Sequence, residues 1–136
     1  MTLFDPRKEL APHFKLSEFF VHRGSFDKES WDYLVSRPEK EKKAILDNLT
    51  KLAKELSHIR LRIGRALQIT SGFRCPLVNR RVGGEDNSYH MKGMAADIVV
   101  PGLTAYKFRE LLGPWRGGLG QYRTFTHLDI GPERSW

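Results

Sequence analysis

A stripe of apolar residues between positions 45 and 59 is the strongest constraint that this sequence places on its fold. The stripe recurs at spacings of four and three residues, the period of one helical face, in Ile45, Leu49, Leu52, Leu56 and Ile59. Upstream, Ser36 can cap a helix, Pro38 suits a first turn, and Glu39 follows three residues after the cap. The pattern predicts a long amphipathic helix over about 38–60 that serves as a scaffold.

Short runs rich in β-branched residues predict strands around this helix. Residues 67–70 end at a Ser-Gly pair, residues 95–100 are stopped by Pro-Gly, and residues 125–130 form a third run. Thr104 can cap a short helix over 105–112. Together these elements predict one α+β domain over residues 1–136, with a small antiparallel sheet backed by the long helix.

The remaining segments lack a regular period. For residues 1–29 we predict an ordered N-terminal arm that consists of loop and one short helical turn. Residues 71–89 predict a long irregular loop, the kind of segment used for binding or catalysis. The glycines of 115–122 predict a strand edge that another group approaches closely, and we expect Trp136 to pack back onto the body.

Composition narrows the classes of partner. Lys and Arg total 23 against 16 acidic residues, so a formal charge of +7 favours anionic partners such as nucleic acid, acidic lipid or wall polymers. The single Cys75 rules out an internal disulfide framework and a thiolate metal cage. Residues 1–10 do not resemble a secretory signal peptide, and no run approaches the roughly 18 to 20 apolar residues of a membrane span. We therefore expect synthesis in the cytoplasm without a signal peptide.

Three metal-capable side chains stand out. His90 and Asp97 flank the point where a polar, glycine-containing loop turns into a β-branched run, and His127 lies in the last predicted strand. Zinc accepts imidazole nitrogens and carboxylates, and three protein ligands with an open position are typical of a catalytic zinc site. The alternative is that these are ordinary histidines and a strand-end aspartate. Spacing alone leaves both interpretations open.

Two further residues have a functional and a structural interpretation. A period of two places His127 and Asp129 on the same strand face, so Asp129 would lie beside the metal. It could orient a metal ligand or act as a general base. Arg74 is either a solvated loop arginine or a bidentate ligand for a substrate carboxylate.

The pattern Ser88-x-His90-x-x-Gly93-x-Ala95-x-Asp97, set beside His127, resembles the zinc D-Ala-D-Ala carboxypeptidase family. That family includes phage endolysin peptidases and shares its fold with the hedgehog signalling domain. Several other stretches are also similar to its bacterial and phage members, so that the resemblance covers nearly the whole chain: residues 14–19, 69–74, 79–84, 117–122, 127–129, 131–132 and 136.

The resemblance implies a zinc peptidase that hydrolyses peptidoglycan stem peptides, as a D-Ala-D-Ala carboxypeptidase or an endolysin-type endopeptidase. It implies one zinc ion held by His90, Asp97 and His127. Arg74 matches the arginine that binds substrate carbonyl or carboxylate groups, and we assign Ser88 to substrate binding with it.

The chain departs from the family at the expected general base. Many members carry Asp or Glu three residues before the last histidine, where this chain has Thr124. Asp129 is then the expected base, with less favoured carboxylates in Glu85, Asp86 and Glu133.

Two other functions compete with this one. A catalytically weak or inactive zinc-containing wall-binding domain would keep the metal ligands, and a basic nucleic-acid-binding domain would use the positive charge. No glycine-rich phosphate loop or RNA-binding signature accompanies the basic residues, so we expect no nucleic-acid partner. We expect a monomer that acts on the cell wall after release or export by another component.

Overall fold

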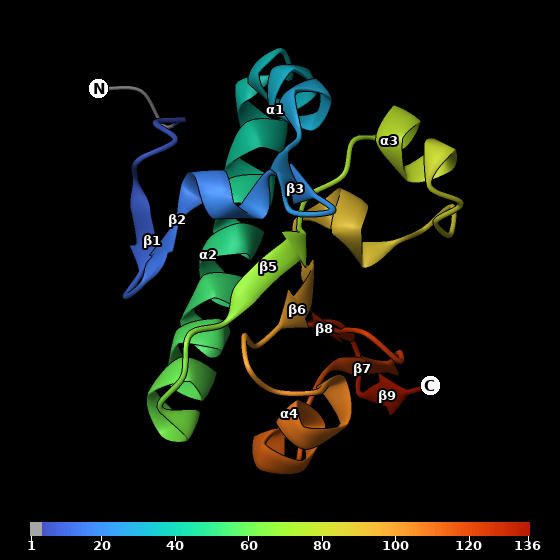
Figure 1. Cartoon of the computed structure of the whole chain (residues 1–136). Coiled ribbons are helices and arrows are strands. Elements are labelled where there is room, and N and C mark those ends of the chain that lie inside the picture. Colours follow the sequence, from blue (N-terminus) through green and yellow to red (C-terminus); the bar gives the residue numbers. More distant parts are fainter. Residues whose placement is uncertain (1–3) are drawn as a thin grey trace.

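The computed structural model describes residues 4–136 and shows a mixed α+β fold (Figure 1). The elements of the N-terminal half are β1 (Glu9–Ala11), β2 (Phe14–Lys15), the 3-10 helix η1 (Leu16–Phe19), β3 (Val21–His22), β4 (Ser25–Phe26), α1 (Lys28–Val35) and α2 (Glu39–Ile63). Those that follow are β5 (Gln68–Ser71), α3 (Pro76–Arg81), the 3-10 helix η2 (Tyr89–Lys92), β6 (Ala95–Val99), α4 (Ala105–Leu112), β7 (Gly118–Gln121), β8 (Thr126–Asp129) and β9 (Arg134–Ser135).

Seven strands form the main sheet, in the order β4-β3-β5-β6-β8-β7-β9. All of its neighbours pair antiparallel except β7 and β9, which are parallel. Strands β1 and β2 form a separate hairpin beside α2 (Figure 1). The expected antiparallel sheet is therefore confirmed, with a parallel edge strand added at the C-terminal side.

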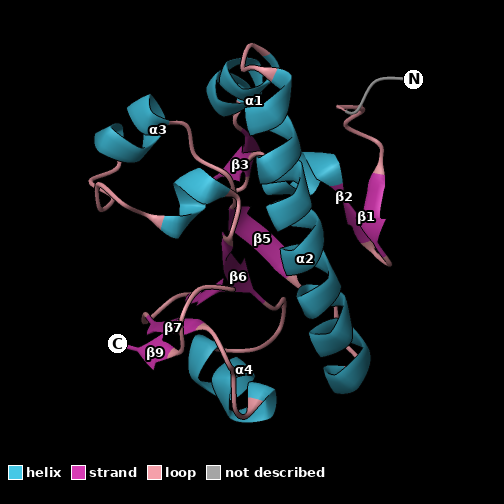
Figure 2. Ribbon diagram, turned by 180° about the vertical axis from the view of Figure 1, so that it is seen from behind, coloured by secondary structure: helices cyan, strands magenta, loops and turns pink. Residues whose placement is uncertain are grey.

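Helix α2 covers one face of the sheet, as Figure 2 shows from behind. Leu49, Leu52 and Leu56 of the predicted stripe are fully buried, and they share one hydrophobic cluster with Ile98 of β6 and Leu128 of β8. Each such leucine contributes roughly 1.5–3 kcal/mol by leaving water. Because strand side chains alternate, the neighbours of these apolar residues on β6 and β8 point to the opposite face of the sheet.

The predicted start of the long helix was wrong in its cap. Ser36 ends α1 as its C-cap, and Pro38 is the N-cap residue of α2 without a side-chain hydrogen bond. The signals at 36–39 belong to a junction between two helices, of which α1 was not predicted. Helix α1 begins after Asp27, whose side chain accepts a hydrogen bond from the Ser30 N–H at 3.0 Å.

Two irregular segments contain more structure than expected. The N-terminal arm holds four short strands, and β3 pairs with β5, so the arm extends the main sheet; residues 1–3 of the predicted arm lie outside the described part. The predicted loop 71–89 contains helix α3 and runs into η2. Strands of two residues and a helix of six are too short to show a hydrophobic period.

The other predicted elements are confirmed. Strands β5, β6 and β8 fall within one residue of the predicted runs, and α4 spans 105–112 as expected. Thr104 caps α4, since its Oγ1 accepts a hydrogen bond from the Lys107 N–H at 3.0 Å. Within residues 4–136, none of the helices combines the length and apolarity that a membrane crossing requires.

Candidate metal centre

The register of the sheet brings distant residues into one row. Directly paired positions run across neighbouring strands in the series His22, Ser71, Asp97, His127 and Gly120. Paired residues on neighbouring strands share a face, which here is the face opposite α2. Asp97 and His127 are therefore neighbours although 30 residues separate them in sequence.

His90 reaches this row from the short helix η2. The hydroxyl oxygen of Ser88 accepts a hydrogen bond from the His90 N–H at 3.2 Å and caps the turn, and Gly93 closes it with φ 72°. The Arg74 N–H donates to the His90 carbonyl at 3.1 Å and ties η2 to the segment after β5. These bonds hold the His90 ring over Asp97.

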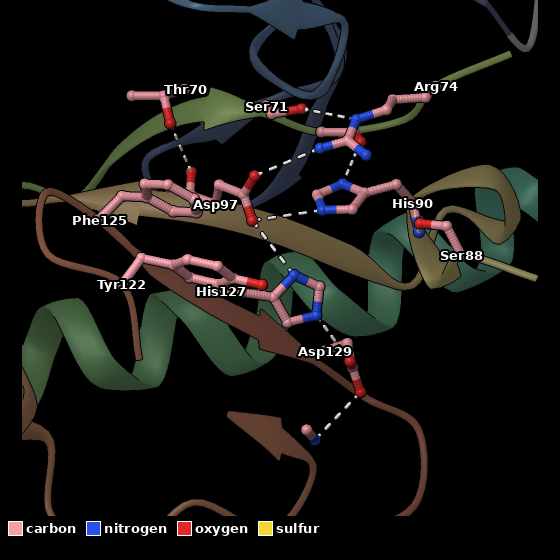
Figure 3. Close-up of polar contacts among 12 residues, drawn as sticks. Thr70, Ser71, Arg74, Ser88, His90, Asp97, Tyr122, Phe125, His127 and Asp129 are labelled. Carbon is pink, nitrogen blue, oxygen red and sulfur yellow. Dashed lines mark hydrogen bonds and ion pairs between the residues drawn. The ribbon is translucent and has the colours of Figure 1, made fainter. Parts of the chain in front are cut away.

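The three predicted metal ligands form one buried cluster (Figure 3). Asp97 Oδ1 lies 3.2 Å from His90 Nε2 and 3.2 Å from His127 Nδ1. The exposed fractions are 3% for His90, 7% for Asp97 and 9% for His127. One ligand atom from each side chain lies within 4.8 Å of the others.

In each histidine, the ring nitrogen that points away from Asp97 has a hydrogen-bond partner of its own. That partner determines which nitrogen is left to bind a metal. His90 Nδ1 lies 2.8 Å from the Gly72 carbonyl, and His127 Nε2 lies 2.7 Å from Asp129 Oδ2. Both partners accept hydrogen bonds, so these nitrogens carry the protons and His90 Nε2 and His127 Nδ1 present lone pairs. Two lone pairs and a carboxylate oxygen then converge on one point. This donor set fits a zinc ion with an open coordination position.

The electrostatics of the cluster agree with a site for a cation. Burial raises the pKa of Asp97, but hydrogen bonds with His127 and His90 outweigh it and hold that pKa below its ordinary value. Burial lowers the pKa of His127, yet its contacts with Asp129 and Asp97 leave that pKa raised overall. The site thus favours positive charge, and a metal ion would compete there with a proton.

Asp129 lies on the other side of His127 from Asp97 (Figure 3). Its carboxylate is fully buried and accepts hydrogen bonds on both oxygens, from Gly118 N, Gly131 N, the Arg134 guanidinium and the His127 ring. Burial raises the pKa of Asp129, but the bonds from His127 and Arg134 lower it to about 2. This environment suits the ligand-orienting role that the sequence left open, and it leaves no oxygen facing a substrate.

Arg74 is not a solvated loop residue, since its side chain is 12% exposed. Its guanidinium lies 3.4 Å from Asp97 Oδ2, 3.1 Å from Ser71 Oγ and 3.2 Å from Asn79 Oδ1. Arg74 therefore holds the carboxylate oxygen that the histidines leave free, at the edge of the cluster.

A cleft of 870 Å³ opens over the cluster. Its lining includes Ser88, Thr124 and Glu85, whereas Asp86 and Glu133 are not among the described residues that line it. The lining carboxylates are those of Asp97 and Glu85, and the lining cations are Arg23, Arg74 and Arg134. Of these cations, Arg74 is paired with Asp97 and Arg134 with Asp129.

Several supporting groups were not expected from the sequence. The Gly72 carbonyl orients His90, Asn79 braces Arg74, and Arg134 pairs with Asp129. A backbone carbonyl leaves no residue-type signal. The expected packing of Trp136 onto the body is confirmed, and it brings the Trp136 ring to 5.1 Å from the His127 ring.

Comparison with known proteins shows similarity to peptidases. The model of the peptidase M15 family matches residues 12–129. The peptidoglycan L,D-endopeptidase MepK of Escherichia coli K12 is 29% identical over 135 residues, covering 88% of this chain and 71% of the relative. The zinc D-Ala-D-Ala carboxypeptidase of Streptomyces albus G is 32% identical over 81 residues, covering 53% of this chain and 31% of the relative. Because the family model spans most of the sequence, the chain belongs to the peptidase M15 family.

Proposed function

We propose that this protein is a zinc-dependent peptidase that hydrolyses a peptide bond in the stem peptides of peptidoglycan. The observation that carries the proposal is the convergence of His90 Nε2, Asp97 Oδ1 and His127 Nδ1 on one buried point beside an open cleft. The activities of the relatives, a peptidoglycan endopeptidase and a zinc carboxypeptidase, support the proposed substrate and metal.

We favour the endopeptidase over the carboxypeptidase. The endopeptidase MepK aligns over 88% of this chain, whereas the carboxypeptidase aligns over 53%. The similarity to MepK therefore extends over more of the length of this chain.

Each side chain has a task in this proposal. A zinc ion, when bound, would supply the Lewis acidity that polarises the scissile carbonyl and acidifies water. Asp129 fixes the proton on His127 Nε2, which keeps Nδ1 free as a ligand. Arg74 holds Asp97 and presents donors to a substrate carbonyl or carboxylate at the edge of the cluster.

The proton acceptor in the proposed mechanism is Glu85. Asp129 has both oxygens engaged and is fully buried, and Asp97 is a ligand, so Glu85 is the remaining carboxylate among the described residues that line the cleft. Glu85 is exposed in the segment between α3 and η2, where water reaches its carboxylate.

The test measures both the fragments released from peptidoglycan and the zinc content of the protein. Purified protein is incubated with peptidoglycan sacculi, with and without chelator, and mass spectrometry identifies the released fragments. We expect zinc-dependent cleavage, and we expect His127→Ala to lose both zinc and activity while His58→Ala, an exposed histidine on α2, keeps both. Full zinc occupancy in His127→Ala would contradict the ligand set. Binding to sacculi without any released fragment would favour the inactive wall-binding domain instead.

A further inference from the structure

The turn between β3 and β4 has an unusual residue at its first position. His22 pairs with Ser25, so the hairpin loop consists of Arg23 and Gly24 alone. Both have positive φ, 51° for Arg23 and 81° for Gly24. A two-residue hairpin with two positive φ angles is a type I′ turn, and its first position favours Asn, Asp or Gly. An arginine in this left-handed conformation is strained.

The fold gains no visible interaction from this strained side chain. Arg23 is exposed, and within residues 4–136 its guanidinium makes no hydrogen bond or ion pair. The other two arginines of the cleft are engaged, Arg74 with Asp97 and Arg134 with Asp129. Strain that local contacts do not explain is typical of functional sites.

Arg23 lies at one end of the metal cleft. It lines the cleft together with His22 and Gly24, and the His22–Ser71 pair continues the strand row that holds Asp97. The Gly24 N–H donates to the Thr70 carbonyl at 3.4 Å, which ties the turn to β5. Figure 1 shows β3 beside the end of β5, the strand that leads to Arg74.

The imidazole of His22 adds no positive charge at this end of the cleft. Burial lowers the pKa of His22, and the charges of Arg74 and Arg23 lower it further, so this imidazole is neutral at pH 7. The free positive charge is therefore on the Arg23 guanidinium, and an anionic group is its natural partner. A guanidinium matches a carboxylate in bidentate geometry.

We propose that Arg23 is a specificity-determining residue that binds a free carboxylate of the substrate peptide at the β3–β4 end of the cleft. The identity of the peptide rests on the proposed function, since peptidoglycan stem peptides carry free carboxylates. Two sources supply such a group: the C-terminal carboxylate of the stem, and a carboxylate along its backbone or side chains.

The strain at Arg23 allows a sharp experiment. Arg23→Asn removes the charge and places a preferred residue in the type I′ turn, so the melting temperature should rise by a few degrees. Binding of a stem tetrapeptide to the zinc-free protein, measured by calorimetry, should weaken by about three- to tenfold, the range for an accessible charge-assisted contact. Arg23→Lys should keep part of the affinity. Lys51→Gln, which removes an exposed charge on α2, is the matched control and should change neither value.

Peptides amidated at one carboxylate at a time identify the partner. If amidation of one carboxylate weakens peptide binding to wild-type protein as much as Arg23→Asn does, that carboxylate is the one bound by Arg23. With the peptide amidated at that position, Arg23→Asn should cause no further loss of affinity. A raised melting temperature with unchanged affinity for every peptide would overturn the proposal. So would a lowered melting temperature, because Arg23 would then serve the fold.

Failure of the proposed function gives a different result. If zinc-loaded wild-type protein cleaves sacculi but binds peptides independently of Arg23, this inference alone fails. If the wild type neither cleaves sacculi nor binds stem peptides, both fail.

Discussion

The carboxylates of Asp97, Asp129 and Glu85 differ in environment and therefore in chemistry. Asp97 faces both histidines, Asp129 is enclosed behind His127, and Glu85 is exposed at the edge of the cleft. Only a carboxylate that water can reach is able to exchange protons during turnover, whereas an enclosed one can fix the orientation of its neighbour. Substitutions of Glu85 and Asp129 should therefore have different measurable effects.

We predict that Asp129→Asn and Glu85→Gln separate these effects. Asp129→Asn removes a charge that pairs with Arg134 and holds the proton on His127, so zinc affinity should fall roughly 10- to 100-fold. Glu85→Gln should leave zinc affinity unchanged and lower kcat by roughly 10²- to 10⁴-fold. Competition with a zinc-binding dye and rates of fragment release measure the two quantities.

Asp86→Asn is the control, since Asp86 adjoins Glu85 but is not among the described residues that line the cleft. It should keep zinc affinity and kcat. If Asp129→Asn kept full zinc affinity and lost turnover, Asp129 would return as the general base.

The candidate metal ligands were accessible from sequence because the pattern from Ser88 to Asp97, set beside His127, resembles a known family, whereas their spacing alone left an ordinary interpretation open. The groups that orient them were less so. The Gly72 carbonyl has no residue-type signal, and Arg134 reaches Asp129 through a two-residue strand at the far edge of the sheet. Their positions follow from the register of the sheet and not from a local pattern.

At the scale of elements, β7 matters because it separates the strand that carries His127 from the strand that precedes Trp136. Gly120 pairs with His127, and a Cβ at position 120 would lie 2.9 Å from His127 Cβ and 2.9 Å from the Trp136 ring. Strands on both sides prevent β7 from moving away. The glycine therefore allows Trp136 to pack against His127.

Gly120→Ala should consequently destabilise the fold by about 1–3 kcal/mol, as overpacking does in a tight site, and should also weaken zinc binding. Urea unfolding and a zinc titration test this pair of effects. Ser135→Ala, an exposed change on the adjacent β9, should leave both values near wild type. Wild-type stability and zinc affinity in Gly120→Ala would show that the site tolerates the methyl group.

Elements that repeat a hydrophobic pattern or are bounded by caps and stop signals were predictable, whereas strands of two or three residues were not. Helix α2 repeats its stripe over many turns, and α4 has both a threonine cap and a buried face that includes Phe108 and Leu112. The cap of α2 was misplaced because Ser36 ends one helix just before Pro38 begins another. The paired strands of the N-terminal arm depend on partners far along the chain, which a local pattern does not reveal.

In the whole molecule, α2 covers one face of the sheet (Figures 1 and 2). The cleft lies on the other face, over Asp97 and His127. The cluster of His90, Asp97 and His127 brings together η2, β6 and β8. A bound ion would therefore join segments that are far apart in sequence. A ligand that binds the folded state stabilises it, by about 2.7 kcal/mol at a free concentration of 100 times its Kd. Zinc should therefore raise the melting temperature of the entire domain.

The stability of the metal-free protein and its affinity for zinc should both depend on pH, in opposite directions. Without metal, His127 has a folded pKa raised above 6.5, so its contacts contribute fully below pH 6.5 and are lost as pH rises through the folded value. The pKa of Asp129 is depressed from 3.8 to about 2, so its contribution is present above pH 3.8 and is lost only in strong acid.

Zinc requires both imidazoles in their deprotonated form at the ligand nitrogen, so its affinity rises over the range in which the metal-free protein loses the His127 contribution. The difference in melting temperature between zinc-loaded and chelator-treated protein should accordingly grow from about pH 5.5 to about pH 8, on either side of the ordinary histidine pKa. Calorimetric scans at matched buffer and salt measure it, and His127→Ala should show no such growth. An equal difference at both pH values would mean that protons and zinc do not compete for His127, and the ligand assignment would have to be abandoned.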